Sequence, residues 1–187
     1  MKIGYQGIGG SNAEDASKFA GKELRIDDFT LVPLISSSNV INALENHLID
    51  IGVVAFSNTW TGYIKEAYEI LNYNKYECIL KMKLNINHCL FKAREDIDNH
   101  LITQVVSHEQ AIKQCASKIS ELIPNARHKY CEDTALAAKK LSTKKYGENC
   151  AVVCSKAAGK KYGLSLIGEN VQDKQENITE FHVIRLK

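Results

Sequence analysis

The residues best suited to chemistry lie near the carboxyl end of the chain, where a polar loop runs into a strand. Residues 168–177 are rich in amides and carboxylates, and the alternation of Ile178, Phe181 and Val183 that follows is typical of a strand. Such a loop delivers hydroxyl and amide groups to the end of a sheet, where Thr179 offers a hydroxyl. On its position alone, Thr179 also fits an ordinary half-buried strand, an environment that threonine favours.

A second polar turn follows the most apolar run of the chain. Residues 51–56 are almost continuously apolar, which is typical of a central strand covered on both faces. The run ends in Ser57, Asn58 and Thr59. In open α/β sheets ligands bind at the carboxyl ends of strands, so this turn is a candidate part of a binding site.

A glycine-rich turn lies near the amino end. Residues 2–6 form a short predicted strand, residues 7–10 contain three glycines, and Ser11 with Glu14 forms a capping box for a helix. The free backbone N–H groups of such a turn can bind an anion, but the same glycines also suit a tight turn that needs positive φ. The spacing does not complete a dinucleotide fingerprint and no P-loop lysine follows, which disfavours NAD and ATP.

Composition limits the class of protein. Hydrophobic residues make up 44% of the 187 positions and charged residues 25%, which indicates a globular chain of one domain or two small lobes. The net charge is +2 and the basic residues are scattered, which gives no support to nucleic-acid binding. No apolar stretch approaches the length of a membrane span, and no signal-like run follows Met1. We therefore expect a soluble, cytoplasmic protein with no membrane partner.

The six cysteines contain no Cys-x-x-Cys pair, and each lies in an apolar or amphipathic segment. Free buried thiols in a reducing compartment are the favoured state, rather than disulfides. Cys150 and Cys154 would lie about 13 Å apart on one strand, too far to share a metal ion. We therefore expect no metal site.

A repeated β/α pattern predicts two lobes with a cleft between them, and clefts of this kind bind small molecules. A long extended stretch at 76–92 would carry the chain from one lobe to the other. We expect lobe 1 to comprise 1–78 and 165–187, and lobe 2 to comprise 79–164. The pattern predicts strands at 2–6, 29–35 (with Pro33 at an edge), 51–56, 101–106, 128–131, 150–154 and 179–186, a segment at 164–167 that heads back to lobe 1, and helices after Ser11 and at 39–49, 63–73, 109–122, 134–141 and 155–162.

Seven segments, in order along the whole chain, resemble the catalytic domain of the prephenate dehydratase family. Each motif alone is weak, and their order and spacing make the resemblance specific. They are Gly7 to Ser11 for the family's Gly-Pro-x-Gly-Thr/Ser turn, Val53 to Gly62 for Pro-Ile-Glu-Asn-Ser/Thr-x-x-Gly, Asn87 to Leu90 for His-x-Leu, Ser107 to Cys115 for Ser-His-Pro-Gln with a following Gln-Cys, Cys131 to Ala138 for Ser-Thr-x-x-Ala-Ala, Tyr162 to Leu164 for Tyr-Gly-Leu, and Asn177 to Phe181 for Asn-x-Thr-Arg-Phe.

The resemblance implies a two-lobed fold like that of type II periplasmic binding proteins, in agreement with the β/α pattern. It implies the conversion of prephenate to phenylpyruvate with loss of water and carbon dioxide, without a cofactor. The protein would then need a proton donor for the departing hydroxyl and donors for the anionic groups of a small substrate. The chain ends about where the family's catalytic domain ends, so we expect no ACT domain. Family members commonly pair, which implies a homodimer.

The resemblance also implies roles for individual residues. Thr179 would be the hydroxyl at the leaving group, with Asn58 and Gln114 as its catalytic partners in the site. The substrate-binding positions would be Ser11, Ser57, Thr59, Ser107, Glu132, Thr134, Glu180 and Phe181. Three of the predicted site residues also have a structural alternative: Ser107 as a helix cap, Gln114 as an ordinary polar residue of an amphipathic helix, and Glu132 as part of a solvated face.

Two departures from the family pattern count against a direct transfer of the function. Ser57 stands where the family has Glu, and Glu180 stands where it has Arg. A carboxylate beside a dianionic substrate would be repelled, so either Glu180 points away from the site, as strand alternation permits, or the ligand differs. Two alternatives follow: a protein that binds a small anion without turning it over, and a divergent lyase that decarboxylates prephenate without expelling the hydroxyl.

Overall fold

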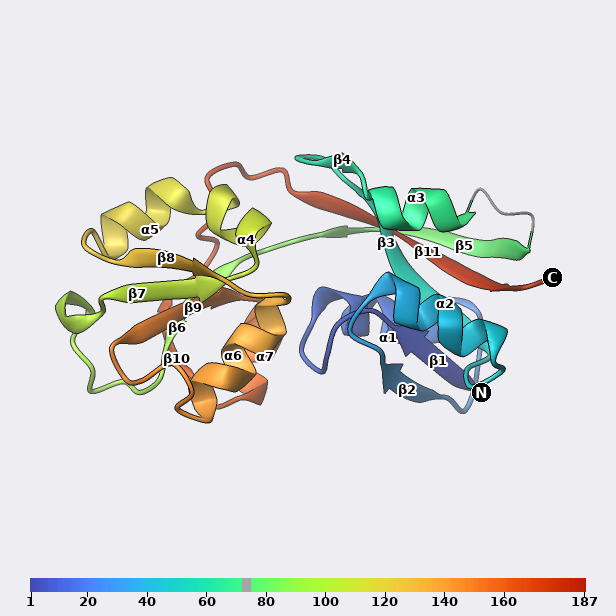
Figure 1. Cartoon of the computed structure of the whole chain (residues 1–187), viewed down its shortest axis with the longest axis horizontal. Coiled ribbons are helices and arrows are strands. Elements are labelled where there is room, and N and C mark those ends of the chain that lie inside the picture. Colours follow the sequence, from blue (N-terminus) through green and yellow to red (C-terminus); the bar gives the residue numbers. More distant parts are fainter. Residues whose placement is uncertain (72–74) are drawn as a thin grey trace. The chain divides into compact units, whose positions relative to one another are not determined.

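The computed structural model describes residues 1–71 and 75–187, which divide into two units with one sheet each (Figure 1). Unit 1 comprises Met1–Ile86 and Glu176–Lys187, and unit 2 comprises Asn87–Gln175. The predicted helix 63–73 is α3 (Lys65–Leu71), and positions 72 and 73 of that prediction lie outside the described residues.

The sheet of unit 1 has the strand order β2-β1-β3-β11-β5, with β4 paired to β3. The first three strands of that order are parallel, and β11 is antiparallel to both of its neighbours. The bounds are β1 (Lys2–Tyr5), β2 (Thr30–Pro33), β3 (Ile51–Asn58), β4 (Gly62–Tyr63), β5 (Tyr76–Asn85) and β11 (Ile178–Leu186), with helices α1 (Asn12–Glu23) and α2 (Ser37–Glu45). Since β2 is an edge strand, the predicted place of Pro33 is confirmed: an edge strand tolerates the missing N–H.

Two helices of unit 1 bury the two faces of this sheet. The alanines of α1 pack with Val53, Phe181 and Val183 in one core cluster. On the other side, Val40 and Leu44 of α2 pack with Val54 and Ile184. Burial of β3 on both sides explains its continuous apolar sequence and confirms the prediction of a central strand.

The sheet of unit 2 has the order β10-β6-β9-β7-β8, in which β9, β7 and β8 are parallel and β6 and β10 extend the sheet in antiparallel fashion. The predicted strand 150–154 is confirmed at the same bounds. The elements are β6 (Cys89–Lys92), the short 3₁₀ helix η1 (Asn99–Leu101), β7 (Gln104–Ser107), α4 (Glu109–Gln114), α5 (Ala116–Leu122), β8 (Arg127–Tyr130), α6 (Thr134–Ser142), β9 (Cys150–Cys154), α7 (Lys156–Lys161) and β10 (Ser165–Gly168).

The unit boundaries differ from the predicted 1–78 plus 165–187 and 79–164. The extended stretch 76–92 is two strands, and all of β5 pairs with β11 in unit 1. The segment that was expected to return to lobe 1 is β10, which pairs with β6 inside unit 2. The chain therefore passes into unit 2 at 86–87 and leaves it at 175–176. Strand pairing decides these unit boundaries, and the local sequence pattern does not show which strands pair.

The single helix predicted at 109–122 is two helices, α4 and α5, separated at Cys115. At the break, the carbonyl of Gln114 accepts a hydrogen bond from the N–H of Asp173 (2.7 Å). The Asp173 carboxylate in turn accepts the N–H groups of Ser117 and Lys118, each at 3.2 Å. A loop from 55 residues further along the chain therefore satisfies the backbone groups that the break exposes.

All six cysteines are free thiols, but the predicted burial holds for only four of them, since Cys78 is exposed and Cys131 is partly exposed. Cys89 and Cys154 lie opposite each other on β6 and β9 and are buried, as are Cys115 and Cys150. Burial raises the pKa of the Cys89 and Cys150 thiols, which makes them poor nucleophiles. Within the described part of the chain, no helix is long and apolar enough to cross a membrane.

Candidate active site

Three polar side chains of unit 1 form a hydrogen-bonded cluster at the end of β3. The Nδ2 group of Asn58 donates to Oγ1 of Thr179 and to Oδ1 of Asn177, both at 2.9 Å. Asn177 is fully buried and Thr179 is 8% exposed. Strand pairing brings them together, because Thr179 on β11 lies directly opposite Asn58 on β3.

The orientation of the Asn58 amide follows from its third partner. The backbone N–H of Trp60 donates to Oδ1 of Asn58 at 2.8 Å, and a backbone N–H can only donate. The Nδ2 group must therefore be the atom that faces Thr179 and Asn177. Because Thr179 accepts at its oxygen, its own hydroxyl proton is not used in the bond to Asn58.

The loop before β11 is fixed to the turn after β3. The backbone N–H of Thr59 donates to the carbonyl of Ile178, and the N–H of Ile178 donates to Oγ1 of Thr59, both at 3.0 Å. The indole N–H of Trp60 donates to the carbonyl of Glu176 at 3.3 Å. The predicted site residue Thr59 thus contributes its hydroxyl to the structure of the loop that holds the cluster.

The other predicted residues of β3 and β11 point elsewhere. Glu180 follows Thr179 directly and so faces the opposite side of the sheet. There its Oε1 lies 2.7 Å from Nε2 of His182, whose ring stacks on Phe56 with centroids 4.0 Å apart. Ser57 pairs with Glu180 across the strands.

Phe181 is buried in the core cluster beneath α1. Its side chain, which was predicted to bind substrate, packs with Val53 and Val183 in that cluster. Its backbone still matters to the site, because it continues the strand that holds Thr179.

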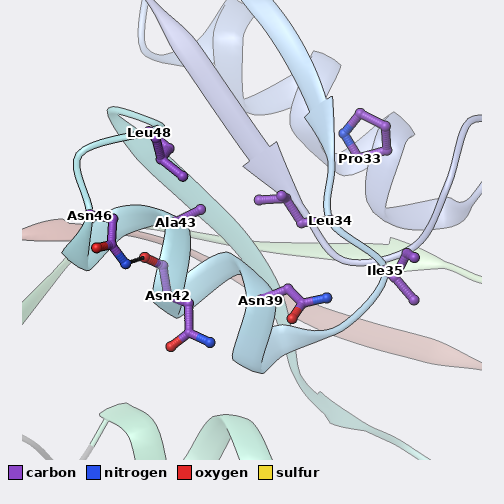
Figure 2. Close-up of a pocket in the computed structure, with 8 residues that line it drawn as sticks. All are labelled: Pro33, Leu34, Ile35, Asn39, Asn42, Ala43, Asn46 and Leu48. Carbon is purple, nitrogen blue, oxygen red and sulfur yellow. Dashed lines mark hydrogen bonds between the residues drawn. The ribbon is translucent and has the colours of Figure 1, made fainter.

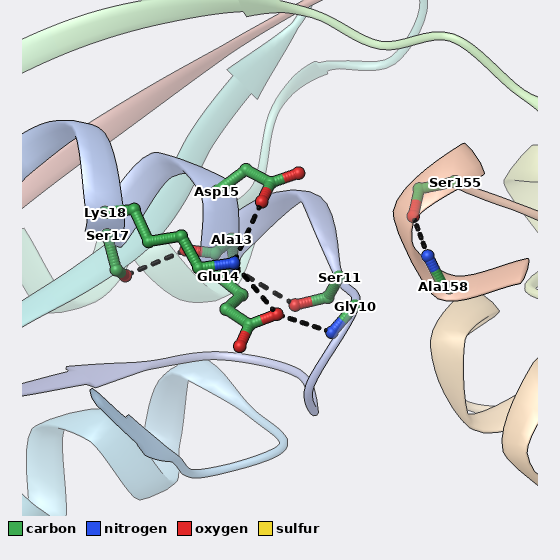
Figure 3. A network of polar contacts seen from close by, with 9 residues as sticks. All are labelled: Gly10, Ser11, Ala13, Glu14, Asp15, Ser17, Lys18, Ser155 and Ala158. Carbon is green, nitrogen blue, oxygen red and sulfur yellow. Dashed lines mark hydrogen bonds and ion pairs between the residues drawn. The ribbon is translucent and has the colours of Figure 1, made fainter. Parts of the chain in front are cut away.

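The glycine turn of unit 1 supports the tight-turn interpretation. Gly7 and Gly10 have φ of 95° and 93°, values that favour glycine. Ser11 caps α1 by accepting the N–H of Glu14 (3.3 Å), and the Glu14 carboxylate accepts the N–H of Gly10 (2.6 Å), as Figure 3 shows. An internal carboxylate therefore takes an N–H group that an external anion would need, and the Ser11 hydroxyl serves as the cap. Since β1 and β3 are parallel, this turn lies at the same edge of the sheet as Asn58.

In unit 2, the predicted catalytic residue Gln114 is paired with a histidine. Nε2 of His88 lies 2.9 Å from Oε1 of Gln114, and both side chains are buried. His88 comes just before β6, whose first residue Cys89 lies opposite Cys154, the last residue of β9. The pair therefore lies near the carboxyl edge of the parallel strands, where α4, α6 and α7 begin.

Two of the three remaining predicted residues of unit 2, Ser107 and Glu132, have structural partners. The Ser107 hydroxyl is fully buried and donates to the carbonyl of Val153 at 2.6 Å. Glu132 forms an exposed ion pair with Lys140 at 3.5 Å. Thr134 is the first residue of α6, which Asp133 caps. Thr134 therefore lies at the start of a helix but does not cap it.

An open hollow of about 390 Å³ lies on unit 1 away from these residues. Figure 2 shows the exposed side of α2, where Asn39, Asn42 and Asn46 line it together with Ile35 and Leu48. None of the predicted site residues lines this hollow, and nothing in its lining identifies a ligand.

Sequence reasoning placed Asn177 and His88 within two of the family motifs but assigned neither residue a role in the site. Asn177 lies two positions before Thr179 in an amide-rich loop, a signal that could have identified it. His88 offers a weaker signal, because a lone histidine before an apolar strand is usual in a protein core.

The division into two α/β units, each with parallel strands extended by antiparallel ones, is the fold of type II periplasmic binding proteins, as expected. A lipoprotein of Bacillus subtilis described as methionine-binding superposes with a TM-score of 0.50 at 12% identity, over all of this chain and 83% of that one. The crystal structure of prephenate dehydratase from Arthrobacter aurescens in complex with L-Phe superposes with a TM-score of 0.86 at 19% identity, over all of this chain and 61% of that one.

The chain belongs to the prephenate dehydratase family, since the model of that family matches residues 3–187. It is 33% identical over 153 residues to the bifunctional chorismate mutase/prephenate dehydratase of Buchnera aphidicola, covering 82% of this chain and 39% of the relative. It is 29% identical over 181 residues to arogenate dehydratase 2 of Petunia hybrida, covering 97% of this chain and 44% of the relative. The chain thus spans less than half the length of these curated relatives. Both relatives are named as dehydratases.

Proposed function

We propose that this protein is a lyase that converts prephenate to phenylpyruvate, with Thr179 as the proton donor. The observation that carries the proposal is the 2.9 Å hydrogen bond from Asn58 to the oxygen of Thr179. A hydroxyl that accepts such a bond can give its proton to a leaving group, while the amide stabilises the negative charge that develops on its oxygen.

The proposed reaction balances without a cofactor. The bond between the ring and its hydroxyl breaks as Thr179 protonates the departing oxygen, which leaves as water. The bond between the ring and its carboxylate breaks at the same time, and its electron pair completes the aromatic ring as carbon dioxide departs. Thr179 then recovers a proton from solvent, so the reaction consumes one proton overall.

The buried amides suit the anionic groups of the substrate. We assign Gln114 to a substrate carboxylate, because amide N–H groups donate to carboxylates and the side chain is buried, which strengthens such a bond. Asn177 is assigned to hold Asn58 in place. Neither assignment needs Glu180, whose side chain faces away from Thr179 and contacts His182.

A second candidate substrate is arogenate, the substrate named for the relatives from Petunia hybrida. Arogenate carries an amino group where prephenate carries a keto group, and the same elimination would yield phenylalanine. The ring chemistry assigned to Thr179 and Asn58 is common to both substrates. We favour prephenate, which is named for the relative with 33% identity.

The test is to incubate the purified protein with each substrate separately. Phenylpyruvate is measured by absorbance in alkali, phenylalanine by chromatography and carbon dioxide by a coupled assay. We expect phenylpyruvate from prephenate. Carbon dioxide without an aromatic product would indicate the divergent decarboxylase instead. No turnover, combined with a rise in melting temperature on adding prephenate, would indicate a binding protein.

A further inference from the structure

The histidine that contacts Gln114 is built into unit 2 on several sides. The backbone N–H of His88 donates to Oε1 of Gln172 (3.0 Å), and its carbonyl accepts the N–H of Val171 (2.9 Å). The Gln172 amide also donates to Oδ1 of Asn87 at 3.2 Å. The position of the His88 ring is therefore fixed by the loop that follows β10.

The same loop fixes the backbone of Gln114. The N–H of Asp173 donates to the Gln114 carbonyl at 2.7 Å, next to the break between α4 and α5. Residues 171–173 thus contact His88 and Gln114 at once. The two side chains meet because one loop holds both backbones.

The hydrogen bond between the two side chains defines the tautomer of His88. Its Nε2 faces a carboxamide oxygen, which can only accept, so Nε2 carries the proton. Nδ1 is buried without a hydrogen-bond partner among the described residues. In this tautomer Nδ1 is an acceptor. Burial lowers the pKa of His88, which agrees with a neutral ring.

We propose that His88 is a positioning residue, which holds the oxygen of the Gln114 carboxamide so that the amide nitrogen is turned toward a substrate carboxylate. This inference rests on the proposed function. Without the histidine N–H, the carboxamide oxygen loses a donor that fixes its place, and the oxygen can then turn toward the substrate. An oxygen in that place would repel a carboxylate.

Two variants separate the hydrogen bond from the packing. His88→Leu removes the donor at similar volume, and His88→Gln keeps an N–H donor. We expect His88→Leu to raise KM for prephenate about tenfold with kcat little changed, which is the pattern of a lost binding interaction. His88→Gln should restore most of the affinity. In a Gln114→Ala background, His88→Leu should raise KM no further, whereas a merely structural role would still do so.

A measurement without turnover keeps this inference separate from the proposed function. In ¹⁵N-labelled wild-type protein, the long-range spectrum of His88 should report a proton on Nε2. The side-chain NH₂ signals of Gln114, assigned from their loss in Gln114→Ala, should shift in His88→Leu and less in His88→Gln. A proton on Nδ1, unshifted Gln114 signals, or an effect of His88→Leu on KM that persists without Gln114 would each overturn the inference. Absence of turnover with these spectra intact would overturn only the proposed function.

Discussion

Asn58 and Thr179 lie 121 positions apart along the chain, and the amide of one donates a 2.9 Å hydrogen bond to the hydroxyl oxygen of the other. The bond joins neighbouring strands at the edge of the sheet where β1 and β3 end. The backbone N–H of Trp60 donates to Oδ1 of Asn58, so the Nδ2 group of Asn58 must be the donor to Thr179.

Replacing Asn58 by aspartate tests that polarity. The carboxylate can still accept from Trp60, but it cannot donate to Thr179, and it would repel the oxygen of Asn177. We expect Asn58→Asp to lower kcat at least about tenfold, because a donor to the developing charge is lost, and to lower the free energy of unfolding by about 1–3 kcal/mol. The measurements are steady-state kinetics and urea unfolding.

The matched control for this substitution is Asn42→Asp, which makes the same change on the exposed side of α2. We expect the control to keep the activity and stability of the wild type. Equal activity of the two variants would exclude a role for the Asn58 donor.

The departure at Glu180 gives a second prediction. Because Glu180 faces His182 and not Thr179, Glu180→Arg should leave turnover unchanged rather than raise it. The variant should melt at a lower temperature, since the buried His182 loses its partner. Glu180→Gln keeps an acceptor for His182 and should melt close to the wild type. A gain of activity in Glu180→Arg would show that the side chain acts on the substrate.

Two buried histidines predict how stability depends on pH. Burial lowers the pKa of His88 and of His182 below the usual value. The unfolded chain then binds more protons than the folded one below about pH 6.5. Stability from these groups is therefore fully present above that pH and is lost as the pH falls toward the folded pKa values.

Urea midpoints measured between about pH 5.5 and 7.5 test this expectation. The midpoint should fall toward the acid end, and the fall should be smaller in His88→Gln. A midpoint that stays level in the wild type would contradict the burial of neutral histidines.

Thiol reactivity tests the burial of the cysteines. Cys78 is exposed, whereas Cys89, Cys115, Cys150 and Cys154 are buried. Reaction with a thiol reagent at about pH 8 should label Cys78 first, because the reagent has little access to the buried thiols. All six should react in denaturant. Fast labelling of Cys89, Cys150 or Cys154, located by mass spectrometry, would contradict the strand pairing of unit 2.

The local sequence pattern alone predicted the elements that are buried along most of their length. The strand 150–154 and the central strand β3 are examples, because continuous burial leaves continuous apolar sequence. Long-range pairing left no such local pattern. The break at Cys115 depends on Asp173, and the place of β10 depends on β6.

The candidate site, too, could be predicted from the sequence only in part. The family motifs selected Thr179, Asn58 and Gln114, and hydrogen bonds connect the first two. Ser107 and Phe181 belong to the same motifs, but their side chains are buried with structural partners. A match to a family motif does not distinguish the residues that face a ligand from those that support the fold.

The central claim is that the Thr179 hydroxyl donates the proton to the leaving group. The most direct measurement is the single-turnover rate of phenylpyruvate formation from prephenate in the wild type, Thr179→Ser and Thr179→Ala, with melting temperatures measured alongside. We predict that Thr179→Ala folds normally and is slower by about 10²- to 10⁴-fold, while Thr179→Ser keeps most of the rate. A folded Thr179→Ala variant that forms phenylpyruvate at the wild-type rate would contradict the account.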